Sequence, residues 1–264
     1  MFSMDQKWLE EQKEQISLAL AQQGIRLVVP VSGASRMGGA AGKEQTLASF
    51  IDHTLLKPTA SKAQIEQLCQ EARQYQFASV CVNPVHVEAA ARLLQGSDVK
   101  VCTVIGFPLG ANSTLAKVLE ARDAAAAGAD ELDMVLNIGS LLEGDYAKVY
   151  SDIKAVRDAV PGRVLKVILE TGYLSKEQIV KGCILTKMAG ADFVKTSTGF
   201  GPGGATVEDI KLMRTVVGED FGVKASGGVR DYTTAAAMIE AGANRIGASA
   251  GIAIVEGLRG ETTN

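Results

Sequence analysis

Short apolar runs alternate with stretches of helical periodicity from about Leu47 to near the end of the chain. The runs are continuous rather than alternating in polarity, which is typical of parallel strands covered by helices. The predicted strands are residues 50–56, 78–83, 100–107, 131–137, 164–170, 193–198, 222–227 and 245–249. Helical patterns lie between them, among others over residues 61–76, 114–127, 175–189 and 231–241.

Eight strand-and-helix units are the number that closes a (β/α)8 barrel, and about 210 residues is near the lower end of its usual size. The predicted fold class is therefore α/β, a (β/α)8 TIM barrel with an N-terminal helical extension. The alternative is an open, doubly wound sheet. That fold is disfavoured because no G-x-G-x-x-G motif follows the first predicted strand.

The N-terminal part of the chain has a different character. Residues 5–23 are strong helix formers with Trp8, Leu9, Ile16 and Leu20 near one face, which predicts an amphipathic helix. Residues 25–31 form a short extended run, and residues 32–42 have the glycine-rich composition of a flexible linker. The expected division is an N-terminal extension (1–46), a barrel (47–258) and a C-terminal tail (259–264).

Composition and charge exclude several classes of protein. The net charge of -3 and the absence of a basic run argue against nucleic acid or an anionic membrane as the main partner. No secretory signal is visible, and no apolar segment approaches the ~20 residues that span a bilayer. Four cysteines without C-x-x-C spacing indicate reduced thiols in the cytoplasm, and only two histidines make a metal centre unexpected.

Three lysines stand alone inside apolar strands: Lys166 in VLKVILE, Lys195 in DFVKTST and Lys224 in GVKASGG. A buried ammonium is costly unless it is paired or loses its proton. Because side chains alternate across a strand, these lysines and Asp133 are expected to point into the barrel from strands four to seven. Their ammonium and carboxylate groups are then expected to converge, because neighbouring strands are close together. Active sites of barrels lie at the C-terminal ends of the strands.

Crowded amines suit nucleophilic chemistry, because an amine attacks a carbonyl only when it is neutral. A neighbouring ammonium and burial both disfavour the charged form, so one lysine can be the nucleophile and another its activator. Asp133 can pair with an ammonium and can carry protons through water. The alternative is a structural network of salt bridges that fills the barrel, and the spacing alone does not select one lysine.

Glycine-rich segments follow the last three predicted strands: TSTGFGPGGAT (196–206), SGGVR (226–230) and GASAG (247–251). Backbone N–H groups in such loops can cradle a phosphate, and barrels place this site after strands seven and eight. Arg230 can add a positive charge there. Lysine imine chemistry beside a phosphate site points to a sugar-phosphate aldolase.

These residues resemble the deoxyribose-phosphate aldolase family, class I aldolases that form a lysine Schiff base on a (β/α)8 barrel. The resemblance covers about Phe50 to Gly257. It is carried by IDHTLLKP (51–58), SVCVNP (79–84), VIGFPLG (104–110), ELDMVLNIG (131–139), LKVILETGYL (165–174), VKTSTGFGPGGAT (194–206) and VKASGGVR (223–230).

The resemblance implies a role for each matching residue. Lys195 is the Schiff-base lysine, Lys224 its activating neighbour, Asp133 a member of the proton relay and Lys166 a further active-site lysine. Substrate- and phosphate-binding residues by the same resemblance are Asp52, Thr198, Gly199, Gly227, Gly228, Arg230 and Ser249. Some family members carry a lysine and a second serine where this chain has Phe200 and Ala250, which predicts looser phosphate binding.

The implied reaction is reversible cleavage of 2-deoxy-D-ribose 5-phosphate to D-glyceraldehyde 3-phosphate and acetaldehyde, with no cofactor or metal. Two alternatives stay open: a related lysine aldolase or transaldolase on another sugar phosphate, and a silent barrel that binds a phosphorylated ligand. The expected partner is a small sugar phosphate, and a homo-oligomer, by family a dimer, is expected. The N-terminal helix is expected to pack on the barrel or on a neighbouring subunit; the alternative is targeting to a partner or a protein compartment.

Overall fold

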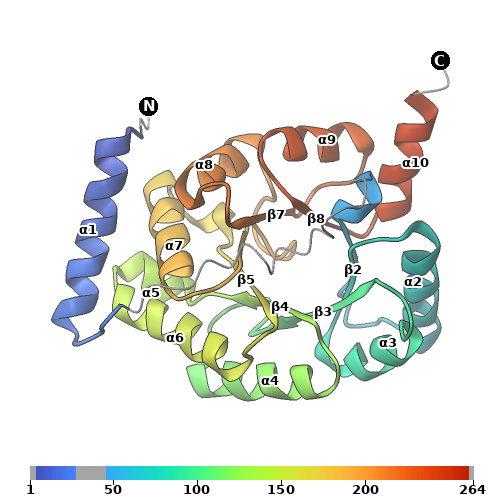
Figure 1. The fold of residues 1–264 in the computed structure, drawn as a ribbon, viewed down its shortest axis with the longest axis horizontal. Coiled ribbons are helices and arrows are strands. Elements are labelled where there is room, and N and C mark those ends of the chain that lie inside the picture. Colours follow the sequence, from blue (N-terminus) through green and yellow to red (C-terminus); the bar gives the residue numbers. More distant parts are fainter. Residues whose placement is uncertain (1–3, 28–45, 262–264) are drawn as a thin grey trace.

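The computed structural model describes residues 4–27 and 46–261, and eight parallel strands form a closed barrel in chain order (Figure 1). The predicted fold is confirmed. Each predicted run contains its strand, although the strands end up to three residues earlier, where the chain turns into the loops. The strands are β1 (Ile51–Leu55), β2 (Ser79–Val82), β3 (Lys100–Ile105), β4 (Glu131–Val135), β5 (Val164–Ile168), β6 (Phe193–Lys195), β7 (Gly222–Ser226) and β8 (Arg245–Ala248).

Helices surround the barrel and connect successive strands (Figure 1). The predicted helices are confirmed, and two of them begin at serine capping boxes, Ser61 before α2 and Ser175 before α7. The helices are α1 (Gln6–Gln22), α2 (Lys62–Tyr75), α3 (Val87–Leu93), α4 (Thr114–Ala126), α5 (Ile138–Glu143), α6 (Tyr146–Ala159), α7 (Lys176–Met188), α8 (Val207–Val217), α9 (Tyr232–Glu240) and α10 (Gly251–Glu261). Short 3-10 turns lie at Leu47–Phe50, Pro84–His86 and Thr171–Tyr173.

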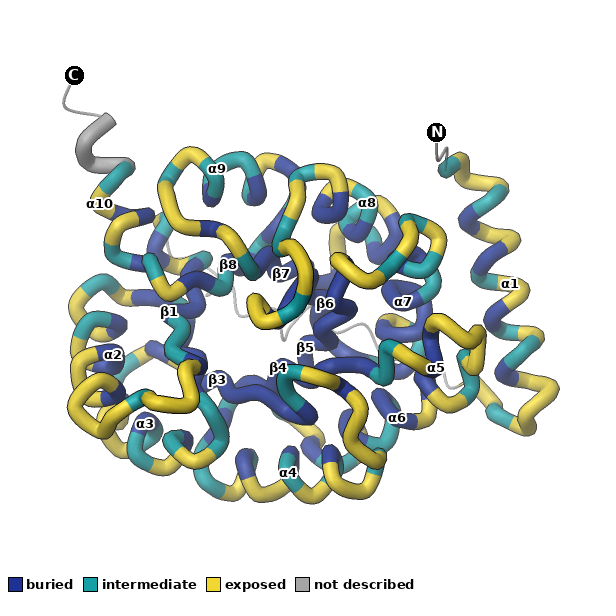
Figure 2. Tube along the Cα trace, turned by 180° about the vertical axis from the view of Figure 1, so that it is seen from behind, coloured by how far each residue is buried: buried dark blue, intermediate teal, exposed yellow. Residues whose placement is uncertain are grey.

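The register of the strands separates an apolar shell from a charged interior. Val167, Val194 and Val223 are paired neighbours on β5, β6 and β7, fully buried in the hydrophobic cluster that joins the sheet to the helices. The residues before and after each of them face the other side, as the period of a strand requires. Figure 2 shows the strands as a buried ring inside helices whose outer faces are exposed.

Helix α1 lies outside this ring, against α6 and α7 (Figure 1). Asp5 caps it by accepting the N–H of Trp8. Leu9, Ile16 and Leu20 are buried on its inner face, as the periodicity predicts. The expected linker at 32–42 and most of the run at 25–31 lie outside the described residues, and α10 reaches into the segment expected as a tail.

Candidate active site

The three strand lysines meet inside the barrel, as their spacing predicts. Lys166, Lys195 and Lys224 are buried, and Lys195 pairs in register with Lys224 on the neighbouring strand. All three ammonium groups contact one carboxylate, that of Asp133 on β4. Lys166 donates to its Oδ1 at 2.8 Å, while Lys195 and Lys224 donate to its Oδ2 at 2.8 and 2.7 Å.

The lysines differ in what else they touch. Lys166 also donates to Glu131 at 2.5 Å and to the Cys102 sulfur at 3.4 Å. Lys224 contacts Asp52 at 2.5 Å. Among the described residues, the only carboxylate within 4.0 Å of the Lys195 ammonium is Asp133. Lys195 is also the one whose side chain keeps some exposure, 4% against 0% for the other two.

A second layer of buried charged side chains lies next to the lysines. Arg245 on β8 bridges Asp52 and Glu131, donating to Glu131 Oε2 at 2.8 Å and to Asp52 Oδ1. Ser79 donates to the same Asp52 oxygen at 2.6 Å. Asp52 therefore lies in this buried network, and within residues 4–27 and 46–261 its carboxylate forms no ion pair or hydrogen bond with the glycine-rich loops. Counting both layers, four cations face three carboxylates, because Arg245 joins the lysines and Asp52 and Glu131 join Asp133.

The electrostatics hold most of these groups in their charged forms. Burial alone would raise the pKa of Asp133, but Lys166, Lys195 and Lys224 hold it well below its ordinary value. Burial likewise disfavours charged Lys166 and Lys224. The carboxylates nevertheless raise both pKa values above the ordinary one, Asp133 foremost for each. Two of the three lysines are therefore firmly protonated.

The residues expected at a phosphate site lie on adjacent loops beyond β6, β7 and β8. Gly227 accepts the N–H of Ala205 at 2.9 Å, which joins the loop after β7 to the loop after β6. Gly199, Gly227 and Gly228 have positive φ values between +83° and +84°, a region that favours glycine. Gly199, Gly228, Arg230 and Ser249 are exposed, and α10 begins two residues after Ser249.

Thr198 differs from the other residues of this group because it is buried and fully engaged. Its N–H and hydroxyl both donate to the carboxylate of Glu170, which follows β5. Phe200, one residue beyond Gly199, is exposed and packs edge-on against Phe107 at a ring-centroid distance of 5.4 Å.

Three residues that contact the predicted site residues were missed from the sequence: Glu131, Arg245 and Glu170. Glu131 shares a strand face with the predicted site residue Asp133, two residues later, and Arg245 lies four residues before the predicted residue Ser249. The period of two is compatible with both as site residues, but it does not distinguish them from charges at a solvated strand entry. Glu170 falls on the same face as Lys166 in the predicted strand 164–170, but β5 ends at Ile168 and Glu170 has a φ of +57°, so the strand period does not set the direction of its side chain.

One group of side chains has the composition of a metal site. The ligand atoms of Cys81, Cys102 and Asp133 lie within 4.8 Å of one another, and all three residues are buried. Thiolates with a carboxylate suit a soft divalent ion. The Asp133 oxygens, however, already accept from three ammonium groups, which would repel a cation at that position. We assign no ion to it.

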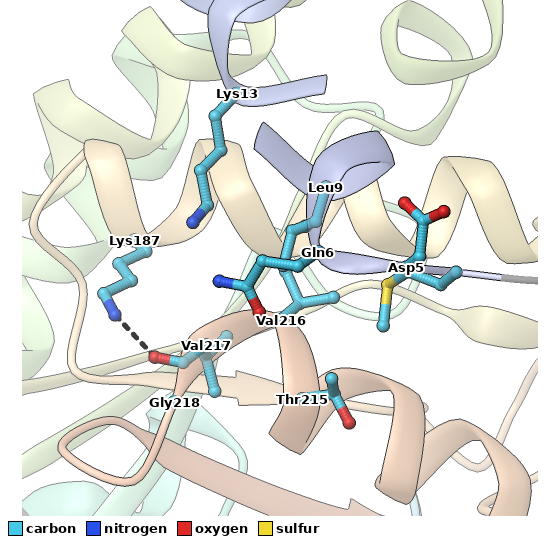
Figure 3. A pocket seen from close by; sticks show the side chains of 10 residues that line it. Asp5, Gln6, Leu9, Lys13, Lys187, Thr215, Val216, Val217 and Gly218 are labelled. Carbon is cyan, nitrogen blue, oxygen red and sulfur yellow. Dashed lines mark hydrogen bonds between the residues drawn. The ribbon is translucent and has the colours of Figure 1, made fainter. Parts of the chain in front are cut away.

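A hollow of about 370 Å³ lies on the outside of the molecule, between α1 and the C-terminal end of α8 (Figure 3). Gln6, Leu9 and Lys13 line one wall, and Thr215 to Gly218 line the other. Lys187 closes one side by donating to the carbonyl of Val217 at 2.5 Å. No catalytic candidate of the barrel borders this hollow, so it belongs to the seam between α1 and the barrel.

Comparison with known proteins identifies close relatives. The pattern of the DeoC/LacD family aldolase matches residues 46–257. A deoxyribose-phosphate aldolase of Caldanaerobacter subterraneus subsp. tengcongensis is 63% identical over 220 residues, 81% of this chain and 95% of that protein. A crystal structure from Coccidioides immitis is 43% identical with a TM-score of 0.81, covering 98% of this chain and 100% of that one. The tetrameric deoxyribose phosphate aldolase of Aeropyrum pernix is 35% identical with a TM-score of 0.76, covering 81% and 91%.

Proposed function

The chain belongs to the DeoC/LacD family of aldolases, and we propose that Lys195 is the amine with which it cleaves 2-deoxy-D-ribose 5-phosphate. The products are D-glyceraldehyde 3-phosphate and acetaldehyde, and the reaction is reversible. The enzyme is a lyase that breaks a carbon–carbon bond.

The observation that carries the choice of Lys195 is the unequal pairing of the three lysines. Lys166 and Lys224 contact two or more carboxylates each, and both have raised pKa values, so they keep their protons. Lys195 contacts only Asp133 and retains some exposure. Four cations against three carboxylates leave one positive charge without a counter-ion, and Lys195 is the cation with the fewest carboxylate partners.

The chemistry follows from that amine. Lys195 Nζ adds to the C1 aldehyde of the open-chain sugar, and loss of water gives an iminium cation. The iminium draws the electron pair of the C2–C3 bond as the C3 hydroxyl loses its proton, which releases D-glyceraldehyde 3-phosphate. The remaining enamine is protonated at C2, and water then hydrolyses the iminium to acetaldehyde and free Lys195.

The neighbouring charges support these steps. Asp133, whose pKa is held low, stays ionised 2.8 Å from the Lys195 nitrogen and stabilises the iminium cation. Lys224 shares the same Asp133 oxygen and serves with Asp133 as the proton relay through water. Lys166 holds Asp133 in place by an ion pair, and Asp52 holds Lys224 in the same way.

We place the phosphate at the glycine-rich loops. Gly199, Gly227 and Gly228 lie on the adjacent loops after β6 and β7, and Arg230 and Ser249 are exposed at the same end of the strands. Backbone N–H groups and the start of α10 suit an anion there. Phe200 and Ala250 add neither a charge nor a hydroxyl, so we expect weaker phosphate binding than a lysine and a serine at these positions would give.

Borohydride trapping tests the assignment. Reduction in the presence of 2-deoxy-D-ribose 5-phosphate should leave a mass adduct on Lys195, located by peptide mapping. Lys195→Leu should abolish both adduct and turnover, whereas Lys166→Leu and Lys224→Leu should still form an adduct at Lys195, more slowly. An adduct on another lysine, or turnover by Lys195→Leu, would contradict the proposal.

We also infer the roles of the remaining segments. Within the extension at 1–46, α1 is a packing element, because it buries Leu9, Ile16 and Leu20 against the barrel instead of presenting them to a partner. The catalytic unit is 47–258, followed by the short tail 259–264. The enzyme is a homo-oligomer, a dimer by our assignment, and works in the cytoplasm, where its four free cysteines stay reduced. No helix in the described ranges has the length and apolar character needed to cross a membrane.

A further inference from the structure

Glu170 is a buried carboxylate that the reaction does not use. It follows β5, one position past Leu169, whose N–H donates to the carbonyl of Lys195. Its backbone is left-handed, with a φ of +57°, and its side chain is 1% exposed. A non-glycine residue in this conformation costs about 1 kcal/mol or more and persists only where the surroundings require it.

The Glu170 carboxylate accepts hydrogen bonds from one residue of the neighbouring loop. Thr198 donates its N–H to both Glu170 oxygens at 3.3 and 3.2 Å, and its hydroxyl donates to Oε2. The hydroxyl in turn accepts the N–H of Phe200 at 3.0 Å. Glu170 thus fixes the start of the loop at Thr198 and, through it, the direction of the chain at Gly199 and Phe200.

Packing reinforces the same junction. A Cβ on Gly201 would approach the Glu170 carboxylate carbon at 2.8 Å, and a Cβ on Gly172 would overlap the carbonyl of Pro202. The two glycines let the turn after β5 and the loop after β6 come into direct backbone contact. The N–H of Thr171 also donates to the carbonyl of Thr196 at 3.0 Å. The Glu170 side chain is thereby enclosed between the two segments.

No cation neutralises this carboxylate: across residues 4–27 and 46–261, no Lys, Arg or His nitrogen is paired with it within 4.0 Å. An unpaired buried carboxylate is expensive unless hydrogen bonds satisfy it. It also lies beside a loop assigned to a phosphate, whose negative charge it would repel. The two donors of Thr198, its N–H and its hydroxyl, offset part of this cost and define a role for the carboxylate.

We propose that Glu170 is a positioning residue that holds the loop 198–201 in the shape that binds the substrate phosphate, and so sets the preference for phosphorylated over unphosphorylated sugars. The inference rests on the proposed aldolase function. With Thr198 held by Glu170, the next backbone N–H groups of the loop stay ordered before the phosphate arrives. Ordering a loop in advance lowers the entropic cost of binding.

The test compares two substrates that differ only in the phosphate, 2-deoxy-D-ribose 5-phosphate and 2-deoxy-D-ribose. In Glu170→Gln the amide oxygen can still accept the Thr198 N–H, but the amide nitrogen cannot accept its hydroxyl. KM for the phosphorylated sugar should rise about tenfold while kcat changes less than about threefold, as expected for one lost charge-assisted hydrogen bond. The kcat/KM for 2-deoxy-D-ribose should change less than about threefold.

Two variants probe the same contact from its other side. Thr198→Val removes the hydroxyl donor and should reproduce the rise in KM, whereas Thr198→Ser keeps the donor and should restore KM to within about twofold of wild type. Glu177→Gln, an exposed carboxylate on α7, is the matched control and should change neither substrate. Thermal unfolding of each variant separates loop ordering from a general loss of stability, and Thr198→Val carries the test if Glu170→Gln does not fold.

Other outcomes overturn the inference. Equal losses on both substrates would make Glu170 merely structural, and a fall in kcat with a shifted pH profile would make it an acid or base. An unchanged KM for the phosphorylated sugar would show that the loop needs no anchor. These failures differ from failure of the aldolase function itself, which wild-type enzyme would reveal by cleaving neither sugar and giving no borohydride adduct.

Discussion

Gly222 on β7 creates the space in which the ring of Phe193 lies, inside the barrel. A Cβ at this position would overlap the ring, and the two residues pair directly in the strand register. The Lys166 ammonium and the Arg245 guanidinium lie over the same ring, 5.9 and 6.0 Å from its centroid. The ring thus supports both layers of the charge network, and a single methyl group at Gly222 acts on all of it.

Gly222→Ala should therefore lower the free energy of unfolding by about 1–3 kcal/mol, the usual cost of overpacking a core. It should also lower kcat, because Phe193 cannot move without displacing Lys166. Urea unfolding and steady-state kinetics measure the two effects. The matched control is Gly139→Ala in α5, where the nearest heavy atom to a new Cβ is 3.8 Å away and no loss of stability is expected. Equal stability of the two variants would refute this account.

At the scale of single residues, the period of two was the strongest guide in the sequence. It placed Asp133, Lys166, Lys195 and Lys224 on one face, and the structure brings all four together. It did not lead to Glu131 and Arg245, because a charged residue at the first position of a strand is equally compatible with a solvated strand entry. The number of acids around the lysines was therefore underestimated.

At the scale of elements, the types and order of strands and helices could be read from the sequence, whereas their ends could not. The strand predicted over 193–198 ends at Lys195, because the N–H of Ser226 bonds to the Thr196 hydroxyl, and the chain then turns toward Glu170. Such a turn depends on a partner that lies 28 residues away in the chain. No local pattern contains that information.

Helix α1 contributes an apolar face and an exposed face, and the two can be compared directly. Ile16 is fully buried, whereas Leu18 is 60% exposed on the same helix. The helix exposes no other large apolar side chain among those described, so its apolar face is already used by the contact with α6 and α7. This arrangement supports our proposal that α1 is a packing element.

Ile16→Ala should accordingly lower the free energy of unfolding by about 2–4 kcal/mol, or loosen α1 from the barrel, because it removes fully buried methylenes. Leu18→Ala should change it by less than about 0.5 kcal/mol. Hydrogen exchange of α1 distinguishes local release from global unfolding, and kcat should be unaffected in both variants. If the two substitutions had the same effect, α1 would not be held by this face.

At the scale of the whole molecule, the barrel interior holds charges where apolar layers are usual. Asp52, Glu131 and Asp133 come from β1 and β4, while the cations come from β5 to β8. The network therefore ties together strands from both ends of the chain. Removing one partner from such a network leaves a buried charge uncompensated, which typically costs about 3–5 kcal/mol.

The pH dependence of unfolding follows from the same network. Against the opposing effect of burial, the neighbouring cations lower the pKa values of Asp52, Glu131 and Asp133 in the folded protein. The unfolded chain, with ordinary values of about 3.9–4.3, then binds more protons in acid, so stability rises with pH through that range. On the alkaline side the raised pKa values of Lys166 and Lys224 keep their contribution intact up to about pH 10 and lose it above.

We therefore expect the free energy of unfolding to be level between about pH 5 and 9 and to fall below about pH 4, by about 1.4 kcal/mol per pH unit for each carboxylate. Asp52→Asn should lower the level part, because Arg245 and Lys224 lose a partner, and should make the acid limb shallower by one carboxylate's share. Urea unfolding from pH 3 to 7 measures both, with Glu177→Gln as the exposed control that should leave the curve in place. An acid limb as steep in Asp52→Asn as in wild type would mean that the proton uptake comes from groups outside the barrel interior.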